Sequence, residues 1–338
     1  MVYKLLLYIN SIFIKMNRTN EQILKGLKRK VFSHIFSYPQ LPELKYINNR
    51  IEANKVIAYA LGGGGGNSCM IARYGSTELS AIVNYLGTLN KSHSIVKYLK
   101  GEIDEWWWSQ GIMNQMERWS GFFPATEENL IRYCKLSLSD ASEIDVLGSW
   151  LPNEYYVDSY SPNCTKVRLR YLEPDFSVAD ASNEWTQVLK GKRVLVIHPF
   201  VETIKKQYAK RHLLFKAPNL LPDFQLLTIK AVQSLGGQCE YASWFDALKH
   251  MEDEMDKLDY DIAIIGCGAY GFNLAAHAKR TGHKAIHLGG ASQLLFGIIG
   301  KRWENKEYYK DIINEHWCRP DESERPATAN SVEGGCYW

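Results

Sequence analysis

DYDIAIIGCGAYGFNLAAHAKRTGHKAIHLGGASQLLFGIIGKRW, Asp259–Trp303, is the stretch that decides the fold. Its apolar run Asp261–Ile265 predicts a buried strand that ends in a glycine turn. The residues Asn273–Arg280 that follow have the composition of a helix, and Lys284–Leu288 predicts a second strand before a second glycine turn. Strand, glycine turn, helix and strand make up a βαβ unit of a parallel sheet. In such units the glycine turn is where a nucleotide binds.

Gly266, Gly268 and Gly271 have the G-x-G-x-x-G spacing of a nucleotide-binding turn. The first glycine makes the turn, the second lets a ligand approach the backbone, and the third lets the helix pack on the strand. An NAD site would also place Asp or Glu at the end of the next strand, whereas this strand ends in His287-Leu288-Gly289-Gly290. The missing acid counts against NAD. The glycines could also be purely structural, because a helix that packs closely on a strand requires small residues at these positions whether or not a ligand binds.

The same alternation of strands and helices continues through the rest of the chain. We expect further strands at Cys69–Arg73, Ile144–Trp150, Lys192–Ile197, Leu226–Ile229 and Gln238–Tyr241. Helices are predicted between them, which favours parallel pairing. The sequence therefore predicts an α/β, Rossmann-like, doubly wound and mainly parallel sheet with helices on both faces.

We expect three parts along the chain. Residues 1–66 form an N-terminal helical segment that ends in the glycine-rich linker Gly62–Gly66, and residues 67–318 form the Rossmann-type domain. Residues 319–338 are rich in Pro, Glu, Ser and Gly and predict an extended tail. The aromatic end of this tail, Tyr337-Trp338, could dock near the site or on a partner.

Composition narrows the class of protein. The 338 residues are 46% hydrophobic and 23% charged, as in soluble globular proteins, and a net charge of +3 without a long basic run argues against a nucleic-acid partner. Seven widely spaced cysteines lack metal-site spacing and indicate a reducing, cytoplasmic location. Val2–Ile14 is too short to cross a bilayer, but residues 1–18 could contact the inner face of a membrane peripherally.

Ligands of doubly wound sheets bind beyond the carboxyl ends of the strands, so the residues that follow each strand belong to one candidate cleft. They are Arg73, Gly75, Ser76 and Glu78; Trp150 and Asn153; His198, Glu202 and Thr203; Gly266, Gly268, Tyr270 and Gly271; and His287, Gly289 and Gln293. An arginine, glycine amides and a carboxylate suit a diphosphate, with or without a divalent ion. Structural explanations remain open: Glu78 would be favoured by the helix dipole alone, and His198 could simply bond a neighbouring loop.

Three motifs resemble the GT-D class of bacterial glycosyltransferases, over roughly Met70 to Trp303: IARYGSTEL (Ile71–Leu79), VLVIHPFVETIKKQY (Val194–Tyr208) and IIGCGAYGFNLAAHAKRTGHKAIHLGG (Ile264–Gly290). The resemblance implies a Rossmann-like fold that uses nucleotide-sugar donors and an Asp-x-Glu metal motif. Arg73, Gly75 and Glu78 match the motif, but Ser76 stands where the class has Asp. One acidic ligand of the implied Mn²⁺ or Mg²⁺ site is therefore missing, and Glu78 is the metal ligand that remains.

These observations predict a nucleotide-sugar-dependent glycosyltransferase, a hexosyltransferase that modifies a hydroxyl of a surface glycan or lipid-linked oligosaccharide. Arg73 and the amides of Gly266–Gly271 would stabilise the departing diphosphate. Glu202 or His198 would act as general base if the reaction inverts the anomeric centre. The alternatives are an NAD(P)-dependent Rossmann oxidoreductase and a nucleotide-sugar-binding protein without catalysis.

Overall fold

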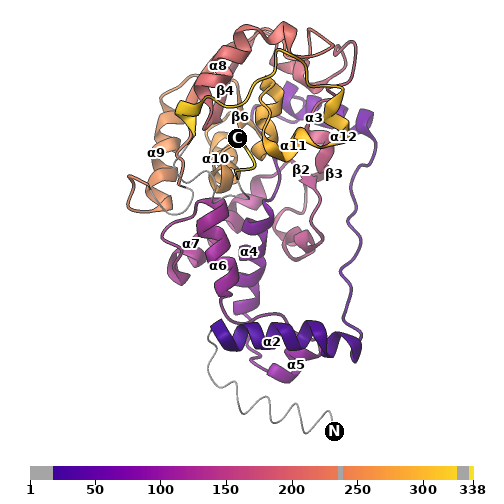
Figure 1. The fold of residues 1–338 in the computed structure, drawn as a ribbon, viewed down its shortest axis with the longest axis vertical. Coiled ribbons are helices and arrows are strands. Elements are labelled where there is room, and N and C mark those ends of the chain that lie inside the picture. The colour runs from indigo at the N-terminus through magenta and orange to yellow at the C-terminus, as the bar shows by residue number, and fades with distance from the viewer. Residues whose placement is uncertain (1–17, 235–238, 326–334) are drawn as a thin grey trace.

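A computed structural model describes residues 18–234, 239–325 and 335–338. Its centre is a seven-stranded sheet in the order β3-β2-β1-β7-β6-β4-β5, and every pair of neighbours is parallel. The strands are β1 (Cys69–Ala72), β2 (Val146–Ser149), β3 (Thr165–Arg168), β4 (Arg193–His198), β5 (Gln225–Lys230), β6 (Ile262–Ile265) and β7 (Lys284–His287). The predicted α/β, Rossmann-like fold is confirmed (Figure 1).

Helices cover both faces of the sheet because its central strands are apolar on both faces. In β4, Leu195 and Ile197 join one buried cluster while Val194 and Val196 join the other. The first cluster is covered by α4 (Ser76–Thr88), α6 (Gln110–Ser120), α7 (Glu127–Asp140), α9 (Trp244–Asp256) and α10 (Gly271–Arg280). The second is covered by α3 (Arg50–Gly62), α8 (Val201–Ala209), η5 (Trp185–Leu189), η9 (Gly289–Phe296) and α11 (Lys301–Glu304). Burying a Val, Leu or Ile side chain stabilises the fold by roughly 1.5–3 kcal/mol.

The order of the strands opens a crevice between β4 and β6. β5 lies on the outer side of β4, and β7 lies on the opposite side of β6. Since such crossovers are right-handed, α8 after β4 and α10 after β6 must cover opposite faces, as Ile204 and Leu274 do. The chain therefore diverges beyond the carboxyl ends of β4 and β6, which is where open α/β sheets bind ligands.

A small third cluster lies at one end of the molecule. There α2 (Arg18–Lys30), η1 (Phe32–His34) and α5 (Ile95–Leu99) bury residues such as Leu24, Tyr98 and Trp107. Figure 1 shows α2 and α5 below the body of the sheet. The tryptophan-rich segment is thus part of two cores, with Trp106 and Trp107 here and Trp108 in the sheet cluster.

The N-terminal segment is less helical than predicted. Between η1 and α3 the chain runs extended, and Ile47 forms a bridge with Val167 of β3. Pro39 and Pro42 interrupt this stretch, and proline disfavours helix both at and before its own position. Residues 1–17, and with them nearly all of the proposed membrane contact, lie outside the described residues. Among the helices that are described, none has the length and apolar character needed to cross a bilayer.

Two strand predictions differ from the structure. β3 was not predicted, because only Val167 of its four residues is fully buried and an edge strand carries a weak periodic signal. The predicted strand Gln238–Tyr241 is wrong for residues 239–241, which have no strand pairing and bend at residues 240 and 241, while Gln238 lies outside the described residues. Both errors fall on short segments, where alternation says little.

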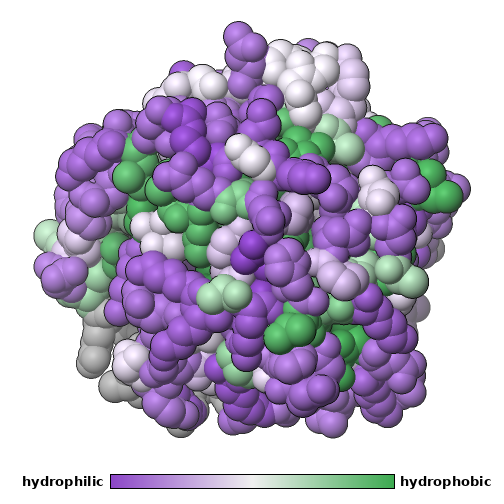
Figure 2. Space-filling model, turned by 90° about the horizontal axis from the view of Figure 1, so that it is seen from above, coloured by the Kyte–Doolittle hydropathy of each residue, from purple (hydrophilic) through white to green (hydrophobic). Residues whose placement is uncertain are grey.

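The chain after β7 crosses back over the sheet. Its short helices are α11, α12 (Glu307–Lys310) and η10 (Glu322–Glu324). Elsewhere in the described residues, further 3-10 helices are η2 (Ala141–Glu143), η3 (Pro152–Tyr160), η4 (Leu169–Leu172), η6 (Arg211–Leu213) and η8 (Gly268–Tyr270). The last four residues lie in the middle of the body, beside α11 (Figure 1). On the face shown in Figure 2, hydrophilic residues predominate and hydrophobic residues form small separate patches.

Candidate functional site

A cavity of about 540 Å³ lies beyond the carboxyl ends of β1, β7, β6 and β4. This volume is in the usual range for small-molecule sites. The cavity is lined by most of the residues predicted from the sequence: Arg73, Gly75, Ser76, Glu78, Trp150, His198, Gly266, Gly268, Tyr270, His287, Gly289 and Gln293. Four predicted residues, Asn153, Glu202, Thr203 and Gly271, are not part of its lining.

The turn between β1 and α4 brings a cation and a carboxylate into the cavity. Arg73 follows the last residue of β1, and Gly75 is the N-cap of α4 in extended conformation. Glu78 lies in the first turn of α4, where its charge is favoured by the helix dipole. Its Oε2 would be 1.7 Å from a Cβ placed on Gly75, so only glycine lets Glu78 fold back over the turn.

Arg73 is a partly buried cation without an acidic partner. Within the described residues its guanidinium makes no ion pair or hydrogen bond, and it lies 5.3 Å from the ring of Trp150. Burial lowers the pKa of Arg73 from its ordinary value, and the nearby carboxylate of Glu78 opposes this shift. Arginine nevertheless stays protonated in proteins. A desolvated cation that faces a cavity without a counter-ion favours an anionic ligand.

The glycine turns meet so closely that side chains would separate them. A Cβ on Gly266 would lie 1.8 Å from Ser292 Oγ and 2.8 Å from both the carbonyl oxygen of Gly289 and His198 Cδ2. Gly268 has a φ of +59°, which favours glycine. Gly271 packs against the ring of His287, whose Cε1 would be 2.3 Å from an added Cβ. The third glycine of the motif thus serves packing of α10 on β7.

Gly266→Ala should lower the free energy of unfolding by about 1–3 kcal/mol, because the added methyl group forces β4, β6 and η9 apart. Equilibrium urea unfolding measures this. Gly26→Ala is the matched control: Gly26 lies inside α2 with no atom within 4 Å of an added Cβ, so alanine should stabilise by about 0.5–1 kcal/mol. A Gly266→Ala protein as stable as the parent would contradict the close packing.

Both histidines of the cavity are neutral. Burial lowers the pKa of His198 to about 3, and burial together with the charge of Arg73 lowers the pKa of His287 to about 3. The Phe200 N–H donates to Nδ1 of His198 at 3.0 Å, which leaves Nε2 as the protonated nitrogen. His198 is therefore better suited to donate a hydrogen bond than to act as the general base expected from the sequence.

The N-terminus of α8 is occupied by a carboxylate of the chain itself. The Glu202 N–H and the Thr203 N–H donate to Glu324 at 2.8 and 3.1 Å, and Thr203 Oγ1 donates to it as well. Glu324 is buried, while the side chain of Glu202 is 57% exposed and pairs with Lys205. This explains why neither Glu202 nor Thr203 reaches the cavity, where the sequence analysis places a general base and a ligand contact.

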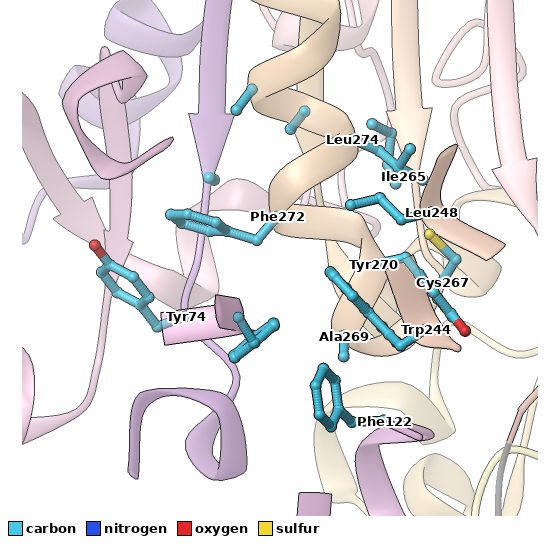
Figure 3. Packing of buried hydrophobic residues seen from close by; sticks show 14 of the residues in the cluster. Tyr74, Phe122, Trp244, Leu248, Ile265, Cys267, Ala269, Tyr270, Phe272 and Leu274 are labelled. Carbon is cyan, nitrogen blue, oxygen red and sulfur yellow. The ribbon is translucent and has the colours of Figure 1, made fainter. Parts of the chain in front are cut away.

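Aromatic and hydroxyl side chains line the half of the cavity nearest α6 and α7. Tyr74 stacks on Phe272 with ring centroids 5.0 Å apart, and Tyr270 stacks on Trp244 at 5.1 Å (Figure 3). Tyr270 and Ser234 share a hydrogen bond of 2.8 Å. The lining of this half is neutral, with Trp119, Ser120, Gly121, Tyr133, Ser137 and Gln233 as further members.

Another part of the lining contains residues that the sequence analysis missed. They are Arg302, Trp303, Lys306, Tyr337 and Trp338, whereas Trp150 was predicted from the turn after β2. Arg302 Nη1 donates to the hydroxyl of Tyr337 at 2.9 Å, and its guanidinium lies 4.6 Å from the centre of that ring. The aromatic residues at the end of the tail were the one signal in the sequence for this part of the lining, but they did not indicate where the tail docks.

The residues present do not build a protein cage for a metal. No group of three or more His, Cys, Asp and Glu side chains with suitable placement occurs in the described part of the chain. Of the carboxylates near the cavity, Glu173 binds Arg170 and Tyr309, and Glu154 binds the turn after β2. Only Glu78 is left, with Ser76 beside it, whereas hard divalent ions take six or more oxygen ligands.

Comparison of the chain with models of known families, with curated proteins and with solved structures found no match. What the cavity can bind therefore follows from its own residues. These provide two arginines, two glycine turns and aromatic walls, together with the carboxylate of Glu78.

Proposed function

We propose that this chain is a nucleotide-sugar-dependent glycosyltransferase that resembles the GT-D class and transfers a hexose to a hydroxyl of a surface glycan or lipid-linked oligosaccharide. The observation that carries the proposal is Arg73, a desolvated cation without an ion pair among the described residues, which lies against Gly289 of the turn after β7, where that turn meets Gly266 of the turn after β6. A diphosphate is the anion that best matches a fixed guanidinium and neighbouring backbone amides.

The chemistry divides between the two halves of the cavity. Arg73 and the backbone amides of Cys267 and Gly268 would stabilise the charge that develops on the leaving diphosphate, while the Gly266 N–H donates to the Ile197 carbonyl in the sheet. Glu78 lines the cavity and interacts electrostatically with both Arg73 and Tyr133. Its carboxylate would accept the proton of the acceptor hydroxyl, as general base. The neutral half, with its hydroxyl and aromatic groups, suits the uncharged sugar.

One feature disfavours the oxidoreductase alternative. β7 ends in His287, which is buried, neutral and packed on Gly271, at the position where dinucleotide sites have the acid that binds the adenosine ribose. The reducing, cytoplasmic location that we propose agrees with the seven cysteines, all of which carry free thiols.

Calorimetric titration with UDP, GDP, CDP, their sugar conjugates and NAD, each with Mn²⁺ and with EDTA, tests the proposal. We expect binding of one nucleoside diphosphate in the micromolar range or tighter, and slow hydrolysis of its sugar conjugate that Glu78→Gln abolishes. Glu307→Gln, an exposed glutamate on α12, is the matched control. Binding without any hydrolysis or transfer would favour a non-catalytic binding protein, and binding of NAD alone would favour the oxidoreductase.

A further inference from the structure

We infer that Trp119 binds a sugar ring of the acceptor by stacking, with hydrogen bonds from Ser120 and Gln233 to the hydroxyls of that ring. This inference rests on the proposed function and specifies where in the same cavity the acceptor binds. It also specifies that a sugar, rather than a lipid carrier, is the part of the acceptor that this wall recognises.

Two of the ten tryptophans are exposed, and both line the cavity. Trp119 is 43% exposed and Trp150 is 39% exposed. The ring of Trp150 lies 5.3 Å from the guanidinium of Arg73, and its indole N–H donates to the Tyr74 carbonyl. Trp119, by contrast, has no partner for its ring or its indole N–H within the described part of the chain. A large apolar ring that is exposed on the wall of a cavity indicates a ligand contact.

The end of α6 holds Trp119 in place. Gly121 caps this helix with a φ of +71°, which favours glycine, and the N–H groups of Gly121 and Phe122 both donate to the Met116 carbonyl. Phe122 is buried and packs against Trp244 with ring centroids 5.5 Å apart (Figure 3). Because its helix end is anchored in the core, Trp119 would lose little conformational freedom when a ligand stacks on it.

Polar groups without a partner lie next to Trp119. Ser234 Oγ donates to the Gly121 carbonyl at 2.6 Å, which joins the loop after β5 to the end of α6. The neighbours of these two residues, Ser120 and Gln233, both line the cavity. Among the described residues, Ser120 Oγ and Gln233 Oε1 have no hydrogen-bond partner. A serine hydroxyl both donates and accepts, and an amide oxygen accepts, so the pair can bind the hydroxyls of a sugar.

The composition of this wall favours a sugar over the other parts of the two substrates. A sugar ring has C–H groups on its faces and hydroxyls around its edge, so it can stack on an indole and bond to polar neighbours at once. A lipid chain would leave those polar neighbours unpaired, and a diphosphate would require cations. The wall formed by α6 and the loop after β5 has no charged side chain in the lining, to which it contributes Trp119, Ser120, Gly121, Val232, Gln233 and Ser234.

Saturation-transfer NMR titrations of the full chain test this inference. The probes are the methyl glycosides of glucose, galactose, mannose, rhamnose and N-acetylglucosamine, added to protein saturated with the nucleoside diphosphate that it binds. We expect at least one glycoside to bind the parent protein in the millimolar range. Trp119→Ala should weaken its binding about tenfold, and Trp119→Phe, which keeps an aromatic face, about two- to threefold. Binding of the nucleoside diphosphate should stay unchanged in both variants.

Leu89→Ala is the matched control, because Leu89 is 58% exposed and lies outside the cavity lining, and thermal melts verify that each variant folds. The inference would be overturned, with the proposed function left in place, if no glycoside bound the parent or if Trp119→Ala bound it equally well. Weaker binding of the nucleoside diphosphate by Trp119→Ala would overturn it too, since Trp119 would then stack on the nucleobase. A parent protein that binds no nucleoside diphosphate would overturn the proposed function and the acceptor role together.

Discussion

Arg73→Met is expected to weaken binding of a nucleoside diphosphate by roughly 30- to 150-fold, or about 2–3 kcal/mol, without lowering the stability of the fold. The loss follows from removing charge-assisted hydrogen bonds in a desolvated site. The unchanged stability follows because Arg73 has no acidic partner to leave unpaired among the described residues, and its pKa is lowered chiefly by burial. Replacing a desolvated charge by an apolar side chain of similar length is often neutral or stabilising.

Calorimetric titration and a urea melt on the same protein measure the two effects. Arg73→Lys should recover part of the affinity, since lysine keeps the charge but not the planar fork. Arg29→Met, at an exposed position of α2 outside the cavity lining, is the control that should change neither quantity by much. If Arg73→Met unfolded more readily and bound normally, the arginine would be structural and the diphosphate site would lie elsewhere.

Local signals were enough to predict the framework of the site. Apolar runs, glycine turns and helix-forming stretches recur along the chain, and each strand-turn-helix unit is encoded within about 20 residues. The carboxyl ends of parallel strands meet at one edge of the sheet. Identifying the strand-turn-helix units was therefore enough to predict that Arg73, Glu78, His198 and Gly266 line one cavity. The rule acts on backbone topology and needs no knowledge of side-chain contacts.

Contacts between distant segments could not be predicted in this way. Glu324 caps α8 from more than 100 residues away, and this contact withdraws Glu202 and Thr203 from the cavity. Tyr337 reaches Arg302 across 35 positions. Nothing in the local sequence of α8 or α11 encodes either partner, since each contact depends on the path of the chain after β7. The same holds for the protonation of His198, which burial and the Phe200 N–H determine.

Glu154→Ala is expected to lower the free energy of unfolding by about 3–5 kcal/mol, because it leaves several buried donors without an acceptor. Glu154 is fully buried and accepts from Ser149 Oγ and, at 2.9 Å each, from the Trp150 and Leu151 N–H groups. Glu154→Gln keeps one acceptor oxygen and should cost less. Urea unfolding measures the difference. Glu307→Ala is the control, because the Glu307 side chain is 87% exposed and its loss should change stability by no more than about 0.5 kcal/mol.

The loss of Glu154 should also affect the ligand site, since the Trp150 indole N–H donates to the Tyr74 carbonyl at 3.1 Å beside Arg73. Nucleotide binding should therefore weaken in Glu154→Ala even where the protein is fully folded, and unchanged affinity would show that Arg73 holds its position without this turn.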